Sequence, residues 1–397
     1  MSYKLFSYNI FPVVSAAVLL AMMSCSENAG VTDIPQQSGE VEVSLEQVPL
    51  LFGMREKTTT RANLDYYVDH VADRTNIALG KQVGMFGYYQ KDTTWVDWND
   101  ALRANFFYNE PMTSEGPTNV GDATANLRYS PVRFWPNGKD DMLAFFAYYP
   151  YTDATDTQGT GITVLQSQFQ SGMYSRGAFH FVTQPNSIDQ VDFMVSQLVA
   201  DQHKADYIYK KENGVVVNDG RVPLLFYHAL SRIIINIDFQ STTTYDKIED
   251  ISITGVKLEG DYYPKHIGDE SAWTNQAYPD TVTIDTSLLP QTGDAGYPSM
   301  IHFDNDNETM RKAILLLIPQ QCVLPTQADP TTGQKINLTF HKTDGSGSVT
   351  IPYGLTDKWL AGRDYIYTFT INDHGDVERT YFYGNAGKPT DGGTISN

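Results

Sequence analysis

The chain has 397 residues, which is enough to bury two hydrophobic cores, and it carries 47 acidic residues against 28 basic ones. An acidic excess of this size repels nucleic acid and anionic membrane surfaces, so we exclude a nucleic-acid-binding role. Cysteine occurs only at Cys25 and Cys322. This excludes a disulfide-rich scaffold and a cysteine-based metal site, and stability must come from hydrophobic cores.

The N-terminus has the pattern of an exported lipoprotein. Lys4 precedes an apolar run, Ile10–Met23, and Ser24 and Cys25 follow it. The run is short for a transmembrane span and leads directly into polar sequence. We predict a signal peptide over residues 1–24 and lipidation of Cys25, which ties the mature chain to a membrane. An ordinary secretory signal or a membrane anchor with an incidental cysteine is the alternative.

The first strand is expected at Val41–Phe52. Its apolar residues are Val41, Val43, Leu45, Val48, Leu50 and Phe52. The first three share one parity and the last three the other, which predicts a bulge or turn near Gln47. The polar, basic stretch Met54–Ala62 follows and predicts an exposed loop.

The rest of the chain also reads as strands. Abundant Tyr, Phe, Thr and Val favour strands, and 30 Gly and 19 Pro provide turns. Further strands are expected at Val83–Tyr89, Leu143–Tyr149, Leu224–Phe239, Ile248–Leu258, Ala313–Ile318, Ile336–His341 and Tyr365–Ile371. The best helical candidate is the short stretch Ser196–Lys204. Many short strands over this length predict an all-β protein of antiparallel β-sandwiches.

A domain boundary is predicted near residue 220. The polar, turn-rich stretch Lys210–Gly220 precedes a long apolar run, Val222–Phe239. We therefore expect an N-terminal β-sandwich domain over residues 25–220, and a C-terminal one over residues 221–397 that ends in a polar tail.

Five segments in chain order then suggest a family. They are Phe134-Trp-Pro136 with Leu143–Tyr151, Asp192–Met194, Phe226–Ile235, Leu316–Gln320 and Trp359–Tyr367. They resemble the YWP…FYAYYP, DLL, FxHxL, LLPQ and WxxGxxYxY segments of the fimbrillin-like proteins of anaerobic gut and oral bacteria. Phe193 and Met194 replace the two leucines of the second segment.

The resemblance implies a type V pilus subunit with two tandem transthyretin-like (Greek-key) β-sandwich domains, exported as a lipoprotein to the outer membrane surface. In many members an arginine-specific protease removes the lipidated segment and the first strand, and a strand of another fimbrial subunit fills the groove by β-strand addition. The groove-filling residues here would be Val41, Val43, Leu45, Leu50 and Phe52.

Cleavage is expected after Arg61, which lies in Thr-Arg-Ala, with Arg55 as the second candidate. The alternative is that both arginines only solvate a loop, because some members of the family are not cut. After Ile371 the chain offers little alternating apolar sequence, and Gly384–Asn397 carries turn signals at Gly387 and Asp391. We infer a tip or accessory subunit rather than a stalk subunit that donates its C-terminus.

Other chemistry finds little support. No His-Glu-x-x-His, Gly-x-Ser-x-Gly, phosphate-binding or dinucleotide-binding motif is present, so we expect no enzyme, no metal and no cofactor. His228 lies on an apolar strand, which predicts a hydrogen-bonded core histidine. Asp304–Glu308 lacks the glycine and distal glutamate of an EF-hand loop, which predicts a solvated acidic turn.

Two functions remain as alternatives to the fimbrial subunit. Trp95 and Trp98 are three residues apart, so a regular strand would point them to opposite faces, whereas a turn could present both to a sugar ring. A monomeric surface lipoprotein that binds glycan or a host ligand would use them in that way, although core packing is the commoner fate. A secreted hydrolase would need paired carboxylates, which spacing alone does not identify.

Overall fold

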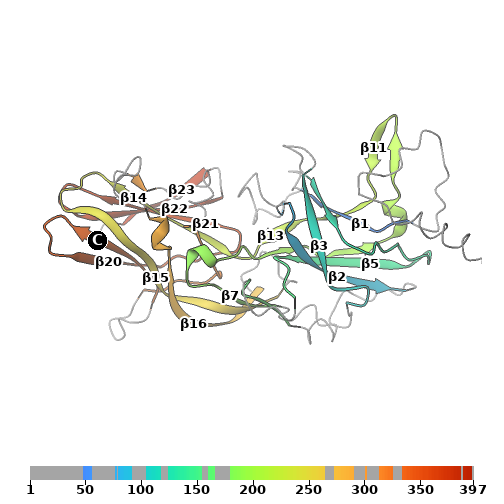
Figure 1. The fold of residues 1–397 in the computed structure, drawn as a ribbon, viewed down its shortest axis with the longest axis horizontal. Coiled ribbons are helices and arrows are strands. Elements are labelled where there is room, and N and C mark those ends of the chain that lie inside the picture. The colour runs from blue at the N-terminus through green and yellow to red at the C-terminus, as the bar shows by residue number, and fades with distance from the viewer. Residues whose placement is uncertain are drawn as a thin grey trace, which may run out of the picture. The chain divides into compact units, whose positions relative to one another are not determined.

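The computed structural model describes residues 48–55, 77, 79–91, 104–117, 124–153, 160–165, 179–263, 272–289, 300–301, 313–324, 333–385 and 388–395. Over these residues the chain is built of strands with short 3-10 helices, so the predicted all-β class is confirmed (Figure 1). The 3-10 helices are η3 (Ser187–Asp189), η4 (Lys204–Tyr207) and η7 (Thr286–Leu288). Within the described ranges, no helix has the length and apolar character that a membrane crossing requires.

A nine-stranded sheet holds most of the strands that precede residue 229. Its order is β12-β1-β4-β3-β2-β5-β8-β13, and β9 also pairs with β5. The strands are β1 (Leu51–Arg55), β2 (Gln82–Gln90), β3 (Phe107–Pro117), β4 (Thr124–Arg128), β5 (Met142–Tyr149), β8 (Met194–Ser196), β9 (Val199–Gln202), β12 (Arg221–Leu224) and β13 (Phe226–His228). Strands β12 and β13 are separated only by Leu225, so one short segment belongs to both ends of the sheet.

Two six-stranded sheets hold most of the remaining strands. The β14 sheet contains β14 (Ser231–Phe239), β17 (Met300–Ile301), β18 (Leu315–Leu317), β21 (Asp364–Ile371), β22 (Val377–Asn385) and β23 (Lys388–Ile395). The β15 sheet contains β6 (Ile162–Val164), β7 (Phe179–Val182), β15 (Tyr245–Tyr262), β16 (Trp273–Thr283), β19 (Lys335–Lys342) and β20 (Ser348–Gly354). Strands β10 (Lys210–Glu212) and β11 (Val215–Asn218) form a separate hairpin.

Most strand pairs are antiparallel, as the sequence predicts, but two are parallel. Strand β1 runs parallel to β12, and β14 runs parallel to β21 over its whole length. The hairpin β6–β7 comes early in the chain, yet β7 pairs with the end of β15. Backbone hydrogen bonds therefore connect the early part of the chain to the β15 sheet.

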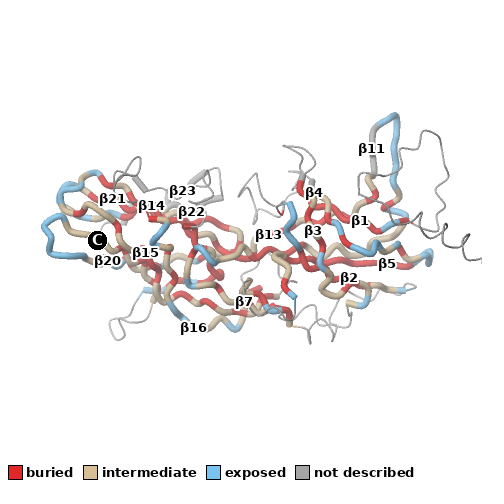
Figure 2. The backbone as a smooth tube through the Cα atoms, in the orientation of Figure 1, coloured by how far each residue is buried: buried red, intermediate tan, exposed pale blue. Residues whose placement is uncertain are grey.

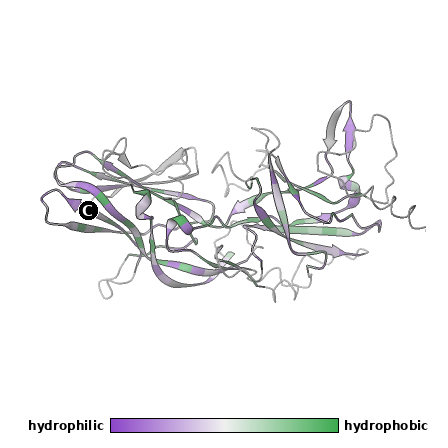
Figure 3. Ribbon diagram, in the orientation of Figure 1, coloured by the Kyte–Doolittle hydropathy of each residue, from purple (hydrophilic) through white to green (hydrophobic). Residues whose placement is uncertain are grey.

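Strand β5 is buried on both faces because its sequence, Met-Leu-Ala-Phe-Phe-Ala-Tyr-Tyr, is a continuous apolar run. Alternate side chains enter two different cores, here named the first core and the shared core. Phe145 lies in the first core and Phe146 in the shared core. Figure 2 shows β5 buried along its length, and Figure 3 shows hydrophobic residues over most of it.

The three hydrophobic cores of the described chain are defined by their largest members. The first core includes Leu50, Phe52, Met54, Phe107, Trp135, Phe145 and Leu224. The shared core includes Phe86, Phe146, Tyr148, Phe179, Phe181, Phe193, Tyr262 and Trp273, so it combines side chains of the nine-stranded and β15 sheets. The second core lies between the β14 and β15 sheets and includes Ile233, Ile235, Ile251, Phe340, Trp359 and Phe369.

Two local predictions are wrong. The stretch Ser196–Lys204 is not a helix: it holds β9, and η4 begins only at Lys204. The polar tail after Gly384 is not merely turn-rich, because β22 extends to Asn385 and β23 pairs with it. The predicted turn at Asp391 is instead a β-bulge, at which two glycines face one residue of β22.

The double burial of β5 generates a prediction. We expect Phe146→Ala to lower the free energy of unfolding by about 3–5 kcal/mol, because the Phe146 side chain is fully buried in the shared core. The exposed residue Thr163 on β6 provides the control, and Thr163→Ala should change stability by less than about 0.5 kcal/mol. Urea unfolding measures both, and equal effects would contradict the two-faced role of β5.

Candidate functional site

Strand β1 completes the nine-stranded sheet between two partners. It pairs in parallel with β12, from Leu51 opposite Arg221 to Met54 opposite Leu224. On its other edge it pairs antiparallel with β4, from Phe52 opposite Leu127 to Arg55 opposite Thr124. The strand therefore has hydrogen-bonded neighbours on both sides, and its removal would expose two strand edges.

The chain before β1 is held in the same way. Pro49 forms a β-bridge with Phe134. The Leu50 amide donates to the Arg133 carbonyl at 2.9 Å, and the Trp135 amide donates to the Val48 carbonyl at 3.0 Å. Proline is tolerated at position 49 because the hydrogen bonds of this bridge are made by its neighbours.

Alternate side chains of β1 and its approach fill the first core. Val48, Leu50, Phe52 and Met54 are all buried there. Burial of each contributes about 1.5–3 kcal/mol of apolar transfer free energy. The groove that these four side chains occupy, here called the β1 groove, is the candidate functional site.

The Phe52 ring lies among three aromatic rings. Its centroid is 4.9 Å from that of Phe145 and 6.0 Å from that of Phe107, both in edge-to-face geometry. The Tyr129 ring is also 6.0 Å away, in a tilted orientation. Edge-to-face pairs of this kind stabilise aromatic clusters beyond the burial of their surface.

Tyr129 also fixes the backbone of the first strand. Its hydroxyl donates to the Leu50 carbonyl at 2.9 Å and accepts from the Arg133 amide at 3.1 Å. Burial raises the pKa of Tyr129 to about 12, partly offset by the Arg133 amide and charge, so the hydroxyl keeps its proton at neutral pH. The guanidinium of Arg133 lies over the Phe107 ring, 4.4 Å from its centroid.

The predicted site residues divide into two groups. Leu50 and Phe52 lie in the β1 groove, as the sequence predicts for a first strand. Cys25, Val41, Val43, Leu45, Arg61, Trp95 and Trp98 lie outside the described residues.

The exposed loop predicted from Met54 begins too early. Met54 and Arg55 are the last two residues of β1, and the Met54 side chain is fully buried. Sequence reasoning missed Met54 as a groove residue because basic and polar residues follow it. The signal was nevertheless present, since Met54 continues the parity of Leu50 and Phe52.

The family-like segments form the surroundings of the groove and a second polar site. Trp135 is buried in the first core and stacks on Tyr207 at 5.0 Å, whereas the neighbouring Phe134 is 49% exposed. Farther along the chain, Trp359 donates to the Tyr367 hydroxyl at 3.0 Å, and Tyr367 donates to Asp357 at 2.7 Å. These aromatic residues are therefore packing and hydrogen-bonding elements.

His228 is hydrogen-bonded, as predicted. Its Nδ1 lies 2.7 Å from an Asp192 carboxylate oxygen. Four residues later, Arg232 makes a bidentate ion pair with Asp364, with N–O distances of 2.7 and 2.5 Å. Burial alone would lower the pKa of His228, but attraction to Asp192, with help from Asp364, outweighs both burial and Arg232 and raises it above its ordinary 6.5.

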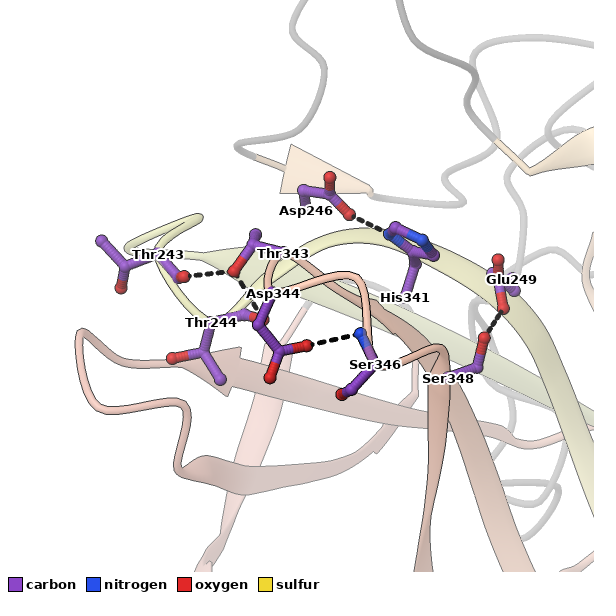
Figure 4. A network of polar contacts seen from close by, with 9 residues as sticks. All are labelled: Thr243, Thr244, Asp246, Glu249, His341, Thr343, Asp344, Ser346 and Ser348. Atoms are coloured by element: carbon purple, nitrogen blue, oxygen red, sulfur yellow. Dashed lines mark hydrogen bonds and ion pairs between the residues drawn. The ribbon is translucent and has the colours of Figure 1, made fainter.

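A polar network connects turns at the ends of β14, β15 and β19 (Figure 4). The Thr343 hydroxyl donates to the Thr243 carbonyl at 2.6 Å, and Asp246 pairs with His341 at 2.8 Å. The Ser348 hydroxyl donates to Glu249 at 2.5 Å. These polar groups satisfy one another and fasten the β19–β20 hairpin to the turn before β15.

The described residues offer no metal-binding cluster. No group of three or more His, Cys, Asp or Glu side chains converges within the described ranges. Cys322 is buried, and burial raises its thiol pKa well above the ordinary value, so the reactive thiolate is disfavoured. The predicted acidic turn at Asp304–Glu308 lies outside the described residues.

Comparisons with known proteins point to one family. A family model described as fimbrillin-like matches residues 60–396. No sequence among the curated proteins matches the chain.

Several solved structures are similar to the chain. A protein described as a cell adhesion protein from Bacteroides uniformis has 16% identity and a TM-score of 0.45, covering 86% of this chain and 98% of its own. The tip fimbrial protein Mfa3 of Porphyromonas gingivalis has 12% identity and a TM-score of 0.34, covering 85% and 99%. The fimbrial anchor protein Mfa2 of the same organism has 10% identity and a TM-score of 0.35, covering 86% and 99%.

The Tyr129 contact generates a prediction. Tyr129→Phe removes the hydroxyl that bonds the Leu50 carbonyl, and we expect a loss of about 1–2 kcal/mol of unfolding free energy. Tyr209→Phe provides a matched control, because Tyr209 is 43% exposed and the same deletion there should change little. Urea unfolding measures both. Equal losses would show that Tyr129 does not hold the first strand.

The His228–Asp192 pair predicts a pH dependence. Because the folded-state pKa of His228 is raised, its stabilisation is complete below pH about 6.5 and is lost as the pH rises through the raised value. We expect both Asp192→Asn and His228→Gln to flatten the fall in unfolding free energy over this range. Urea unfolding at several pH values measures the slope. A slope unchanged in both variants would contradict the assignment.

Proposed function

Because this chain belongs to the fimbrillin-like family, a family of structural fimbrial subunits and not of enzymes, we propose that it is a fimbrial subunit that accepts a partner's strand in place of β1. The observation that carries the proposal is the position of β1. It lies between β4 and β12, and buried side chains anchor it in the first core. An incoming strand of the same pattern would restore both the ladders and the burial.

Cleavage would have to precede the exchange. Arg55 is paired with Thr124 at the end of the β1 ladder, so a protease would first have to open that pair. Arg61 lies six residues farther along the chain, beyond the ladder. This difference supports Arg61 as the processing site, with Arg55 second.

The C-terminal strand supports a tip or accessory role. Strand β23 pairs with β22 of its own chain, and its sequence, Lys-Pro-Thr-Asp-Gly-Gly-Thr-Ile, has no alternating apolar face. A subunit that donated this segment would have little apolar surface to bury in a partner. We propose that the subunit accepts a strand without donating its C-terminus.

The proposal includes export and anchorage. The signal over residues 1–24 would be removed, and lipid on Cys25 would hold the precursor in the outer membrane until cleavage releases it. The mature chain would comprise two β-sandwich units that meet near residue 220.

The test is arginine-specific proteolysis of the lipid-free mature protein, followed by mass spectrometry and by native and unboiled denaturing gels. We expect a cut after Arg61 and no SDS-resistant ladder, because the chain lacks a strand to donate. The doubly substituted Arg55→Lys, Arg61→Lys protein is the control and should stay intact at this loop.

Either of two other results would revise the proposal. A ladder that collapses on boiling would identify a self-polymerising stalk subunit. A wild-type protein that resists cutting and remains monomeric would favour an uncleaved adhesin or a free-standing surface lipoprotein.

A further inference from the structure

We propose that the β1 groove selects its incoming strand by one aromatic side chain, placed where Phe52 lies, and that the donor is a different protein chain. The inference rests on the proposed strand exchange and adds to it the kind of strand that fits. Strand β1 itself serves as the template, because it occupies the groove in the structure.

The pocket at position 52 differs from its neighbours in the groove. Phe52 is surrounded by the rings of Phe107, Tyr129 and Phe145, at centroid distances between 4.9 and 6.0 Å. An aliphatic side chain would fill part of the volume but would lose the edge-to-face contacts. Leu50 and Met54 fill the same core without such a ring cluster, so their positions should accept apolar residues of similar volume.

The register of the incoming strand is fixed by backbone contacts. The Tyr129 hydroxyl and the Arg133 carbonyl both bond the backbone of residue 50. Side chains alternate along a strand, so the residue two positions after this clamp points into the aromatic pocket. A fitting donor therefore has apolar residues at the positions of Val48, Leu50 and Met54 and an aromatic residue between the last two.

The chain's own C-terminus lacks this pattern. Over Gly384–Asn397, Ile395 is the only large apolar residue, and no aromatic residue is present. A second copy of this chain therefore has no C-terminal strand that fits. The donor is instead a partner protein with an alternating apolar segment that carries one aromatic residue.

The experiment uses the mature protein after cleavage in the loop that follows β1. Fluorescent peptides compete with the retained N-terminal fragment, and bound peptide is measured by gel filtration. The probes are the peptide of residues 46–55, its Phe52→Met and Leu50→Met variants, and the peptide of residues 384–397. Both methionine substitutions are apolar and lie on the same face of the strand.

We expect the peptide of residues 46–55 to exchange into the groove. Phe52→Met should weaken its binding about tenfold or more, because the aromatic contacts are lost. Leu50→Met should weaken it only a few-fold. The peptide of residues 384–397 should not bind.

The other outcomes separate the two levels of the proposal. Equal binding of the Phe52→Met and Leu50→Met peptides would overturn the aromatic selection and leave strand exchange standing. Binding of the C-terminal peptide as tight as that of residues 46–55 would overturn the assignment of a different donor. If even the peptide of residues 46–55 failed to exchange, the proposed function and this inference would both be wrong.

Discussion

Strands β2 and β5 have almost no solvent-facing side chains, and the rest of the described fold depends on this double burial. One face supports the first core, in which β1 packs. The other face supports the shared core, to which Tyr262 and Trp273 contribute from β15 and β16. Because β7 also pairs with β15, hydrogen bonds and apolar packing connect the nine-stranded sheet to the β15 sheet. A change in either strand is therefore felt in two cores.

The segments by which the chain resembles its family act as connectors within this arrangement. His228 pairs with Asp192, and Arg232 pairs with Asp364, so three segments far apart in the sequence meet through charged contacts. Between these pairs, the Trp273 indole donates to the Ala229 carbonyl, where the chain passes from β13 to β14. A partly buried charged pair is costly to break on one side only, which gives these positions a structural reason to keep their residue types.

Sequence reasoning succeeds where a strand has an apolar face. Leu143–Tyr149 and Tyr365–Ile371 are found almost to the residue because their apolar runs are long. It fails where burial is divided. Around β9, Val199 packs against the first core, while its neighbours Leu198 and Ala200 pack against the shared core, so the expected alternation disappears. Strand β23 is missed for the opposite reason, because an edge strand with polar residues carries no apolar signal.

The side chains of the first strand enter only one of the three cores. Leu50, Phe52 and Met54 belong to the first core, and no residue of β1 belongs to the shared or second core. Loss of β1 would therefore remove burial and two ladders at one site, while the packing that connects the nine-stranded sheet to the β15 sheet would stay complete. The cost is localised, so the remaining fold can keep the β1 groove in shape until another strand fills it. This separation of cores is the physical condition that assembly by strand exchange requires.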